Sequence, residues 1–218
     1  MGLSFQIKGS HMYLKVDPRN PAPRHLKIIL DKLREGGLII YPTDTVYAVG
    51  CDLNNREAIE KLAKVTGKKA KIDHFSLICP DLSTMSRYTV PFEDRKYKLM
   101  KRLLPGPVTF ILKTNKEVPK LFKNSKKTIG IRIPDHPVPR AIAKEWGSPL
   151  ITTSLNHNDD DIVKYHTDPE EIHERFKNHV SLVIDGGPGN NTSSSIIDCS
   201  GDEIEVLRDN QSVTEMVG

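Results

Sequence analysis

Short apolar segments that alternate with amphipathic helical patterns are the feature of this 218-residue sequence that most constrains its fold. In residues 24–35, Leu26, Ile29 and Leu33 repeat at the spacing of one helix face, and a pair of glycines separates them from the apolar segment 38–41. Further helices are expected over residues 54–66, 93–104, 137–147 and 168–176, and further strands over residues 75–79, 108–112, 128–134, 150–153, 182–185, 195–198 and 204–208. Strands that alternate with helices predict an α/β sheet covered by helices on both faces.

The whole pattern fits a single domain, because no repeat or long linker interrupts it and 218 residues is an ordinary domain length. No apolar run approaches the ~20 residues of a membrane-spanning helix. Three widely spaced cysteines, with no metal-ligand spacing, predict reduced thiols in a cytoplasmic protein. Gly9-Ser10-His11-Met12 resembles a vector scar, so we expect a tag remnant over residues 1–11, the domain over 12–210 and a tail over 211–218.

The segment 38–52 is the strongest candidate for part of a binding site. It begins as a buried strand, breaks at Pro42 and then presents Thr43, Asp44 and Thr45 in succession. Ligand sites of α/β proteins collect at strand ends, where loops hold polar side chains. The alternative is an ordinary strand and turn.

Several common kinds of active site are excluded by missing motifs. The chain has no G-x-S-x-G nucleophile elbow, no complete P-loop, no G-x-G-x-x-G fingerprint and no zinc-ligand set, and His136 lies in a proline-rich turn where a structural role is expected. Hydroxyls, amides and isolated cations remain, and preorganised cations can promote nucleotidyl transfer without a protein nucleophile. The candidates for such a site are Lys69, Arg132, Arg208, Ser154, Asn156, Ser194 and Ser195.

Six ordered motifs carry a family resemblance. They are Tyr-Pro-Thr-Asp-Thr-Val-Tyr from residue 41, Leu-Pro-Gly-Pro-Val-Thr from 104, Ile-Gly-Ile-Arg-Ile-Pro-Asp-His-Pro from 129, Thr-Ser-Leu-Asn from 153, Asp-Gly-Gly from 185 and Ser-Ser-Ile-Ile-Asp from 194. In this order they resemble the YrdC-type family of threonylcarbamoyl-AMP synthases from about residue 20 to residue 208. The resemblance implies a twisted, open, mixed sheet of the YrdC/RibB-like kind, with a concave, positively charged surface.

The resemblance also implies a reaction and its substrates. The family joins L-threonine, bicarbonate and ATP into threonylcarbamoyl-AMP and pyrophosphate, and this product supports N6-threonylcarbamoyladenosine formation in tRNA. Thr43, Thr45 and Arg132 would then bind threonine and bicarbonate. The residues implied to bind the nucleotide are Lys69, Ser154, Asn156, Ser195 and Arg208. Mg²⁺ would arrive with ATP, without ligands from the protein.

Departures from the family motifs resemble its YciO-like branch. Where active members carry Lys-x-Arg, this chain places Gly67 and Lys69, and a lysine cannot reproduce the bidentate fork of an arginine. The usual Ser-Ala-Asn is Ser-Leu-Asn, with Leu155 at its centre. The alternative function is therefore double-stranded RNA or tRNA binding with little synthase activity, in which Lys68 and Lys71 would contact phosphates. The oligomeric state is not predicted by the sequence.

Overall fold

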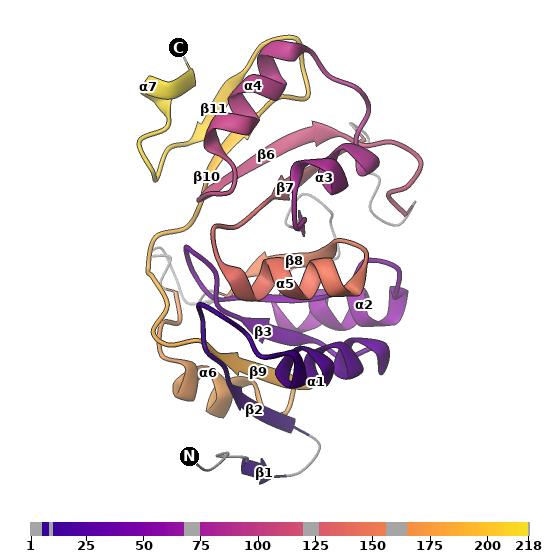
Figure 1. Cartoon of the computed structure of the whole chain (residues 1–218), viewed down its shortest axis with the longest axis vertical. Coiled ribbons are helices and arrows are strands. Elements are labelled where there is room, and N and C mark those ends of the chain that lie inside the picture. The colour runs from indigo at the N-terminus through magenta and orange to yellow at the C-terminus, as the bar shows by residue number, and fades with distance from the viewer. Residues whose placement is uncertain (1–5, 9–10, 68–74, 120–126, 156–164, 218) are drawn as a thin grey trace.

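An eleven-stranded mixed sheet forms the centre of the protein, in a computed structural model that describes residues 6–8, 11–67, 75–119, 127–155 and 165–217 (Figure 1). The strand order is β1-β2-β9-β3-β4-β8-β5-β7-β6-β10-β11. The strands are β1 (Gln6–Lys8), β2 (His11–Lys15), β3 (Ile39–Tyr41), β4 (Ala48–Asp52), β5 (Ser76–Ile78), β6 (Val108–Lys113), β7 (Thr128–Arg132), β8 (Leu150–Ser154), β9 (Leu182–Asp185), β10 (Ser195–Asp198) and β11 (Glu205–Arg208). Parallel pairs join β2 to β9, β9 to β3, β5 to β7 and β6 to β10, and the other pairs are antiparallel.

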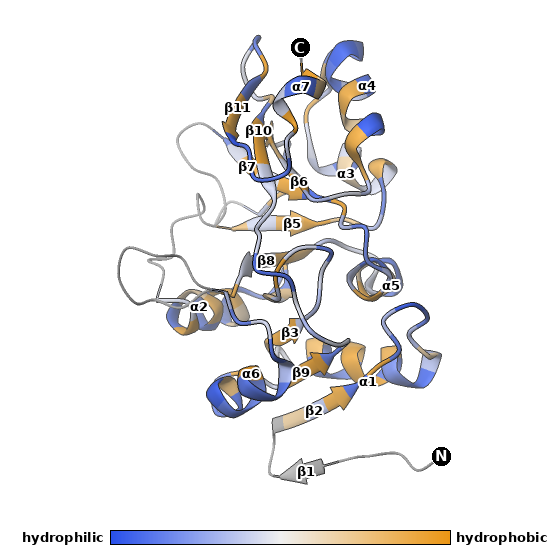
Figure 2. Ribbon diagram, turned by 90° about the vertical axis from the view of Figure 1, so that its left-hand side faces the viewer, coloured by the Kyte–Doolittle hydropathy of each residue, from blue (hydrophilic) through white to orange (hydrophobic). Residues whose placement is uncertain are grey.

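Helices cover both faces of this sheet, as the alternating sequence pattern predicts. They are α1 (Pro23–Arg34), α2 (Arg56–Val65), α3 (Leu82–Tyr88), α4 (Asp94–Leu103), α5 (Pro137–Trp146), α6 (Pro169–Phe176) and α7 (Thr214–Val217). Figure 2 shows α1 and α5 on one side of the central strands and α2 and α6 on the other, each with apolar residues turned toward the sheet. The predicted α/β class, the open mixed sheet and the single domain are confirmed.

Local sequence signals fix the starts of several helices. The Asp168 carboxylate accepts hydrogen bonds from the amides of Glu170 and Glu171, and Pro169 occupies the first helical position of α6. His136 caps α5, because its Nδ1 accepts a hydrogen bond from the Val138 amide at 3.2 Å. Burial lowers the pKa of His136, which favours the neutral ring that can accept this bond. The predicted structural role of His136 is confirmed.

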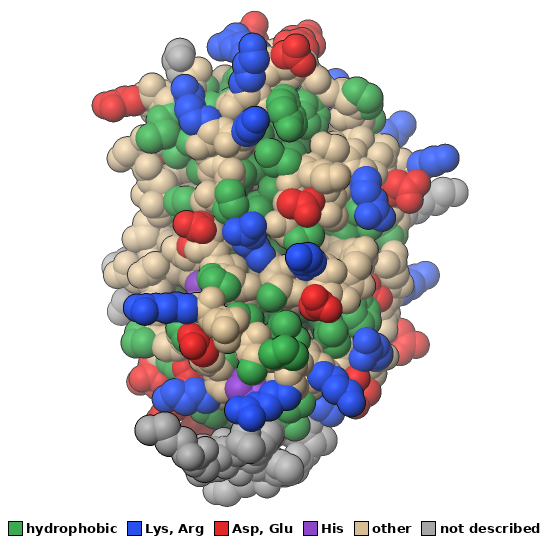
Figure 3. Space-filling view, viewed as in Figure 1, with side chains coloured by type: hydrophobic (Ala, Val, Ile, Leu, Met, Phe, Trp, Pro, Cys, Tyr) green, Lys and Arg blue, Asp and Glu red, His purple; other side chains and the backbone are tan. Residues whose placement is uncertain are grey.

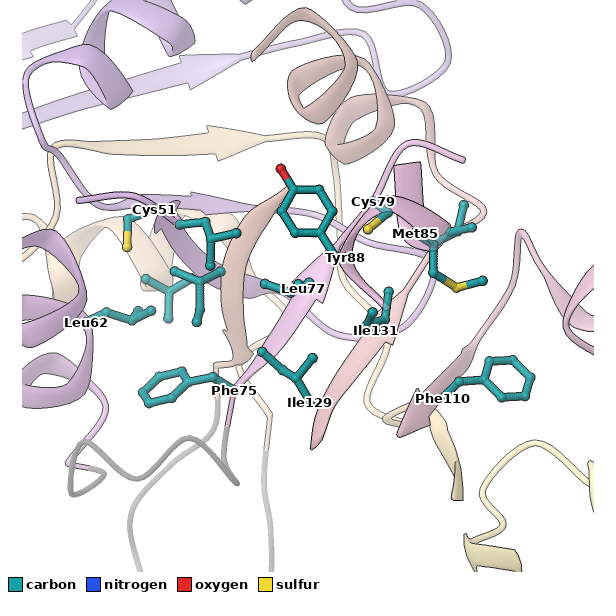
Figure 4. Close-up of a cluster of buried hydrophobic side chains, with 14 of the residues drawn as sticks. Cys51, Leu62, Phe75, Leu77, Cys79, Met85, Tyr88, Phe110, Ile129 and Ile131 are labelled. Atoms are coloured by element: carbon teal, nitrogen blue, oxygen red, sulfur yellow. The ribbon is translucent and has the colours of Figure 1, made fainter. Parts of the chain in front are cut away.

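The larger of two hydrophobic clusters joins α2, α3, α4 and α6 to one set of strand residues (Figure 4). Leu77 and Ile131, which lie in register on β5 and β7, are both fully buried in it. In the second cluster, α1 and α5 pack against the strands through Ile29, Leu33 and Ile142. All three cysteines are buried free thiols, in agreement with the sequence prediction.

The structure adds β4 and α3 between the predicted elements, β1 and β2 before them and α7 after them. β4 forms a hairpin with β3, so the segment 38–52 contains two strands around a turn where one strand was expected. α3 follows β5 and begins at Asp81, whose carboxylate accepts a hydrogen bond from the Thr84 amide at 2.7 Å. No helix in the described ranges is long and apolar enough to cross a membrane.

Candidate functional site

Thr43 and Thr45 lie in the turn that joins β3 to β4, and local hydrogen bonds fix both side chains. The Thr43 hydroxyl donates to the carbonyl of Val46 at 2.8 Å and accepts from the Thr45 amide at 3.0 Å. The two hydroxyl oxygens lie 3.1 Å apart. Threonine hydroxyls commonly close turns in this way. Because both residues are buried, their hydroxyls are held in defined positions.

Arg132, the last residue of β7, contacts this turn from across the sheet. Its Nη1 donates to the Thr45 hydroxyl at 2.7 Å, and its Nη2 donates to Asp44 Oδ1 at 2.5 Å. Only 9% of the Arg132 side chain and 12% of the Asp44 side chain are exposed. Successive strand residues face opposite sides of a sheet, so burial of Ile131 in the core turns Arg132 away from it. The structure thus brings together Thr43, Thr45 and Arg132, the residues that the resemblance implies bind threonine and bicarbonate.

One atom of each partner in this ion pair has no hydrogen bond. Asp44 Oδ2 and Arg132 Nε are buried and lack a partner among the residues that the structure describes. Buried polar atoms are nearly always hydrogen-bonded, so a water molecule or a small polar ligand at the pair would supply the missing hydrogen bonds. Burial lowers the pKa of Arg132, whereas the charge of Asp44 raises it. Because arginine keeps its proton in proteins, the site holds a fixed cation beside a fixed carboxylate.

A second cation, Arg208, stands at the end of β11. Its Nε donates to the carbonyl of Ser194 at 2.9 Å, and the Ser194 hydroxyl lies 2.9 Å from the hydroxyl of Thr109. The charge of Arg208 contributes to lowering the pKa of Arg132, so the two guanidinium groups act on each other. This arrangement extends the positive charge of the site from β7 toward β10 and β11.

A row of small residues crosses four central strands beside Arg132. Gly50 lies in register with Thr152, Thr152 with Ser76, and Ser76 with Gly130. A Cβ atom at Gly130 would lie only 2.7 Å from the Ser76 hydroxyl, so a larger residue there would require the Ser76 side chain to move. Ser76 and Gly130 remain partly exposed although their strands are central. Because residues two apart on a strand face the same side, Gly130 and Arg132 share one face, which a polar ligand can approach.

The segment after β9 packs against the turn that joins β3 to β4 and carries Thr43 and Thr45, which is called the threonine turn below. The Asn190 amide donates to the carbonyl of Thr45 at 3.1 Å, and its side-chain nitrogen donates to the carbonyl of Asp44 at 3.1 Å. Gly189 lies against the Tyr47 ring, where a Cβ atom would come within 2.6 Å. The position of the turn therefore depends on residues almost 150 positions later in the chain.

Known proteins that resemble this chain identify its family. The family model for Sua5, YciO and YrdC proteins, described as "Telomere recombination", matches residues 31–210. This chain belongs to the Sua5/YciO/YrdC family. It is 36% identical to the YciO protein of Escherichia coli K12, whose own function is uncharacterised, over 90% of this chain and 94% of that protein. The crystal structure of E. coli YciO matches with a TM-score of 0.87 and 34% identity, and covers 94% of this chain and 98% of that one. The YciO-like branch of the family is thereby confirmed.

Two more distant relatives have names that refer to threonine. A threonylcarbamoyl-AMP synthase of Bacillus subtilis is 30% identical over 80% of this chain and 50% of that protein. The structure of Pyrococcus abyssi Sua5 complexed with L-threonine has a TM-score of 0.81 at 22% identity, over 90% of this chain and 57% of that one. At this identity the second likeness establishes a shared fold.

The other predicted site residues of this Sua5/YciO/YrdC-family protein are less closely grouped. Ser154 ends β8, is half-buried and pairs in register with Ala48. The Ser195 hydroxyl accepts hydrogen bonds from the amides of Asn210 and Gln211, both at 3.0 Å, and is fully buried by that turn. Their nucleotide-binding roles stay predictions. Four further predicted residues, Lys68, Lys69, Lys71 and Asn156, lie outside the described residues, so the charge of the predicted concave surface also stays a prediction.

Several residues of the site were not assigned roles from the sequence. Asp44 stood within the quoted motif, but nothing in the sequence shows that it pairs with Arg132. Asn190 carries no motif, and only its position after Asp-Gly-Gly hints at a role. Leu155 is buried in the larger core cluster, and its amide donates to the Tyr47 carbonyl at 2.9 Å. The Leu155 side chain, which replaces the alanine of the usual Ser-Ala-Asn motif, therefore packs in the core.

No cluster of three or more His, Cys, Asp or Glu side chains suitable for a metal ion occurs in the part of the chain that the structure describes. The Asp44 carboxylate accepts from Arg132 instead, and its backbone carbonyl accepts from the Asn190 side chain. We therefore assign the Asp44 carboxylate to the ion pair with Arg132.

Replacing Tyr47 by phenylalanine should loosen the segment that holds the threonine turn. The buried Tyr47 hydroxyl donates to the carbonyl of Gly187 at 2.7 Å and accepts from the Gly186 amide at 3.3 Å. Its loss leaves both backbone groups without this partner, and the free energy of unfolding should fall by about 1–3 kcal/mol. Urea unfolding of both proteins measures the change. Tyr97→Phe is the matched control, since Tyr97 is 40% exposed, and equal effects of the two substitutions would contradict this role for Tyr47.

Proposed function

We propose that this protein binds L-threonine at the Asp44–Arg132 pair and converts it, with bicarbonate and ATP, into threonylcarbamoyl-AMP. The observation that supports the proposal is the pair of buried atoms without partners, Arg132 Nε and Asp44 Oδ2. An α-amino acid carries a carboxylate that can accept from the first and an amino group that can donate to the second. The hydroxyls of Thr43 and Thr45 lie beside the pair and hold the turn and Arg132 in place through their own hydrogen bonds.

The proposed chemistry uses the same residues for orientation. The amino group of threonine combines with bicarbonate and releases water, which gives a carbamate. A carbamate oxygen then attacks the α-phosphorus of ATP, and pyrophosphate leaves. Arg132 and Arg208 stabilise the negative charge of the carbamate and phosphates, since fixed cations favour a transition state in which charge is redistributed. Mg²⁺ that accompanies ATP would neutralise part of the phosphate charge, as is general for nucleotide reactions.

The product of this reaction is an activated acyl-adenylate. Its proposed role is to donate the threonylcarbamoyl group to an adenosine of tRNA, as the family resemblance implies. The threonylcarbamoyl-AMP synthase of B. subtilis, at 30% identity, supports the proposal. The relative YciO of E. coli is itself uncharacterised, so the proposal for this branch is tested by assaying this protein.

A pyrophosphate assay tests the proposed function directly. Purified protein is incubated with L-threonine, bicarbonate and Mg-ATP, and pyrophosphate release is compared with reactions that lack threonine or bicarbonate. We expect release that depends on both, and a threonylcarbamoyl-AMP mass in the reaction mixture. Release that is independent of threonine, or no release at any substrate concentration, would overturn the proposal.

RNA binding is the second candidate function, and α4 supplies the observation that favours it. Arg95, Lys98, Lys101 and Arg102 are all exposed on this helix, and none belongs to an ion pair of the described residues. Figure 3 shows Lys and Arg side chains at this end of the molecule. Cations of this kind bind nucleic-acid phosphates in a salt-dependent way. Salt-sensitive tRNA binding without threonine-dependent pyrophosphate release would favour this candidate over the synthase.

A further inference from the structure

A surface cavity of about 420 Å³ lies at the end of the sheet that carries α4. Its walls come from the segment 90–93, from α4, from the end of β6 and from the turn 199–202 after β10. Figures 1 and 2 show α4, β6 and the β10–β11 hairpin gathered at this end of the molecule. None of the residues assigned above to the threonine site lines the cavity. A volume of this size accommodates a small organic molecule.

Lys96 is the buried charged group of this cavity. Only 6% of Lys96 is exposed, although lysine is rarely buried unless its charge is paired. Its ammonium donates a hydrogen bond to the carbonyl of Gly201, which is a neutral acceptor. No carboxylate of the described residues lies within ion-pair distance of it. An ammonium group has three N–H donors, so Lys96 retains a buried positive charge and capacity for an anionic partner.

The remaining walls restrict the chemistry of that partner. Val90, Pro91, Phe92 and Leu112 give the cavity apolar surface, which suits a hydrocarbon group. Glu93, Asp202 and the exposed Lys113 also belong to the lining, so the two lysines and two carboxylates balance, and a second negative charge on the ligand would meet the carboxylates. A molecule with one negative charge and an apolar body therefore fits better than a phosphate, a dicarboxylate or a nucleotide.

We propose that this cavity is a second ligand site, in which the buried Lys96 ammonium binds the carboxylate of a small apolar monocarboxylic acid. The carboxylate replaces water at Lys96 and makes a charge-assisted hydrogen bond in a partly desolvated position. The apolar body lies against Phe92 and its neighbours. The site is independent of the proposed synthase function, because the two share no residue.

Phenylacetate is a suitable probe, because it combines one carboxylate with a flat apolar group. We expect it to bind with a Kd of about 1 mM, the range typical of a ligand of this size. Binding is followed by isothermal titration calorimetry and by the rate at which iodoacetamide alkylates Cys199, a wall residue that is only 3% exposed. Saturating phenylacetate should slow alkylation of Cys199 several-fold, with Cys51 and Cys79 as internal references in the peptide mass spectrum.

Lys96→Met keeps the aliphatic stem and removes the charge, so the Kd for phenylacetate should rise at least about 10-fold. Lys98→Met is the matched control, since Lys98 is exposed on the same helix and does not line the cavity. Arg132→Ala, at the threonine site, should leave the Kd unchanged. If Lys96→Met fails to fold, wild-type protein still decides the matter with phenylacetamide, the uncharged analogue. Equal binding of phenylacetamide and phenylacetate, or no phenylacetate binding at 20-fold above the expected Kd, would overturn the proposal.

Discussion

Arg132→Ala is expected to abolish most threonine-dependent pyrophosphate release, with kcat/KM for threonine reduced about 100- to 1,000-fold. Arg132 is the group that joins the parts of the candidate site, since it donates to both Thr45 and Asp44. Its removal takes away the cation that would face the threonine carboxylate or the carbamate. It also releases the turn from β7. Steady-state assays at varied threonine, with saturating bicarbonate and Mg-ATP, measure the loss.

Two comparisons separate loss of binding from loss of folding in this variant. Arg132→Lys retains the charge but lacks the fork that divides its donors between two partners, so it should recover only part of the activity. Arg34→Ala removes an arginine from the exposed pair with Asp31 and should leave kcat/KM unchanged. Near wild-type activity of Arg132→Ala, with unchanged KM for threonine, would place the threonine site elsewhere in the protein.

Local patterns in the sequence predicted most of the elements because each depends on neighbours in the chain. The leucines and isoleucines of α1 repeat at helical spacing, and their burial against the sheet is the direct consequence. Asp168 followed by Pro169 predicted the start of α6 for the same kind of reason. The structure confirms both, because capping and amphipathic packing are decided within one or two turns.

The elements that the sequence did not predict lack such local signals. β4 is a short strand with Gly50 at its centre and almost no exposed side chain, so it shows neither polar alternation nor a strong β-forming run. α3 has the sequence Leu-Ser-Thr-Met-Ser-Arg-Tyr, in which serine and threonine are weak helix formers. Tertiary packing of Met85 and Tyr88 into the larger cluster stabilises it instead.

The contacts of the candidate site also lack local sequence signals. Arg132 and Thr45 are 87 positions apart, so no periodicity relates them, and only the family resemblance grouped them beforehand. The contact of Asn190 with Asp44, 146 positions away, follows from no motif or periodicity, and only the preceding Asp-Gly-Gly hints at a role for Asn190. Chain topology decides these contacts.

Asp44→Ala is expected to be among the most destabilising substitutions at the site. The Asp44–Arg132 pair is about nine-tenths buried on both sides, and removal of one partner leaves the other charge buried without compensation. Such losses lower the free energy of unfolding by about 3–5 kcal/mol. Asp31→Ala, in the exposed pair with Arg34, is the control and should cost less than about 1 kcal/mol. Urea unfolding of each variant gives both values.

The double variant Asp44→Ala/Arg132→Met decides whether the pair itself is responsible. Methionine removes the buried guanidinium and fills part of its space, so the double variant should be more stable than Asp44→Ala alone, by at least about 1 kcal/mol. Activity should not return with stability, because the group proposed to bind threonine is absent. Recovery of both would mean that the pair serves only the fold. Additive losses of stability would mean that the two charges do not compensate each other, and the geometry assigned to the site would be wrong.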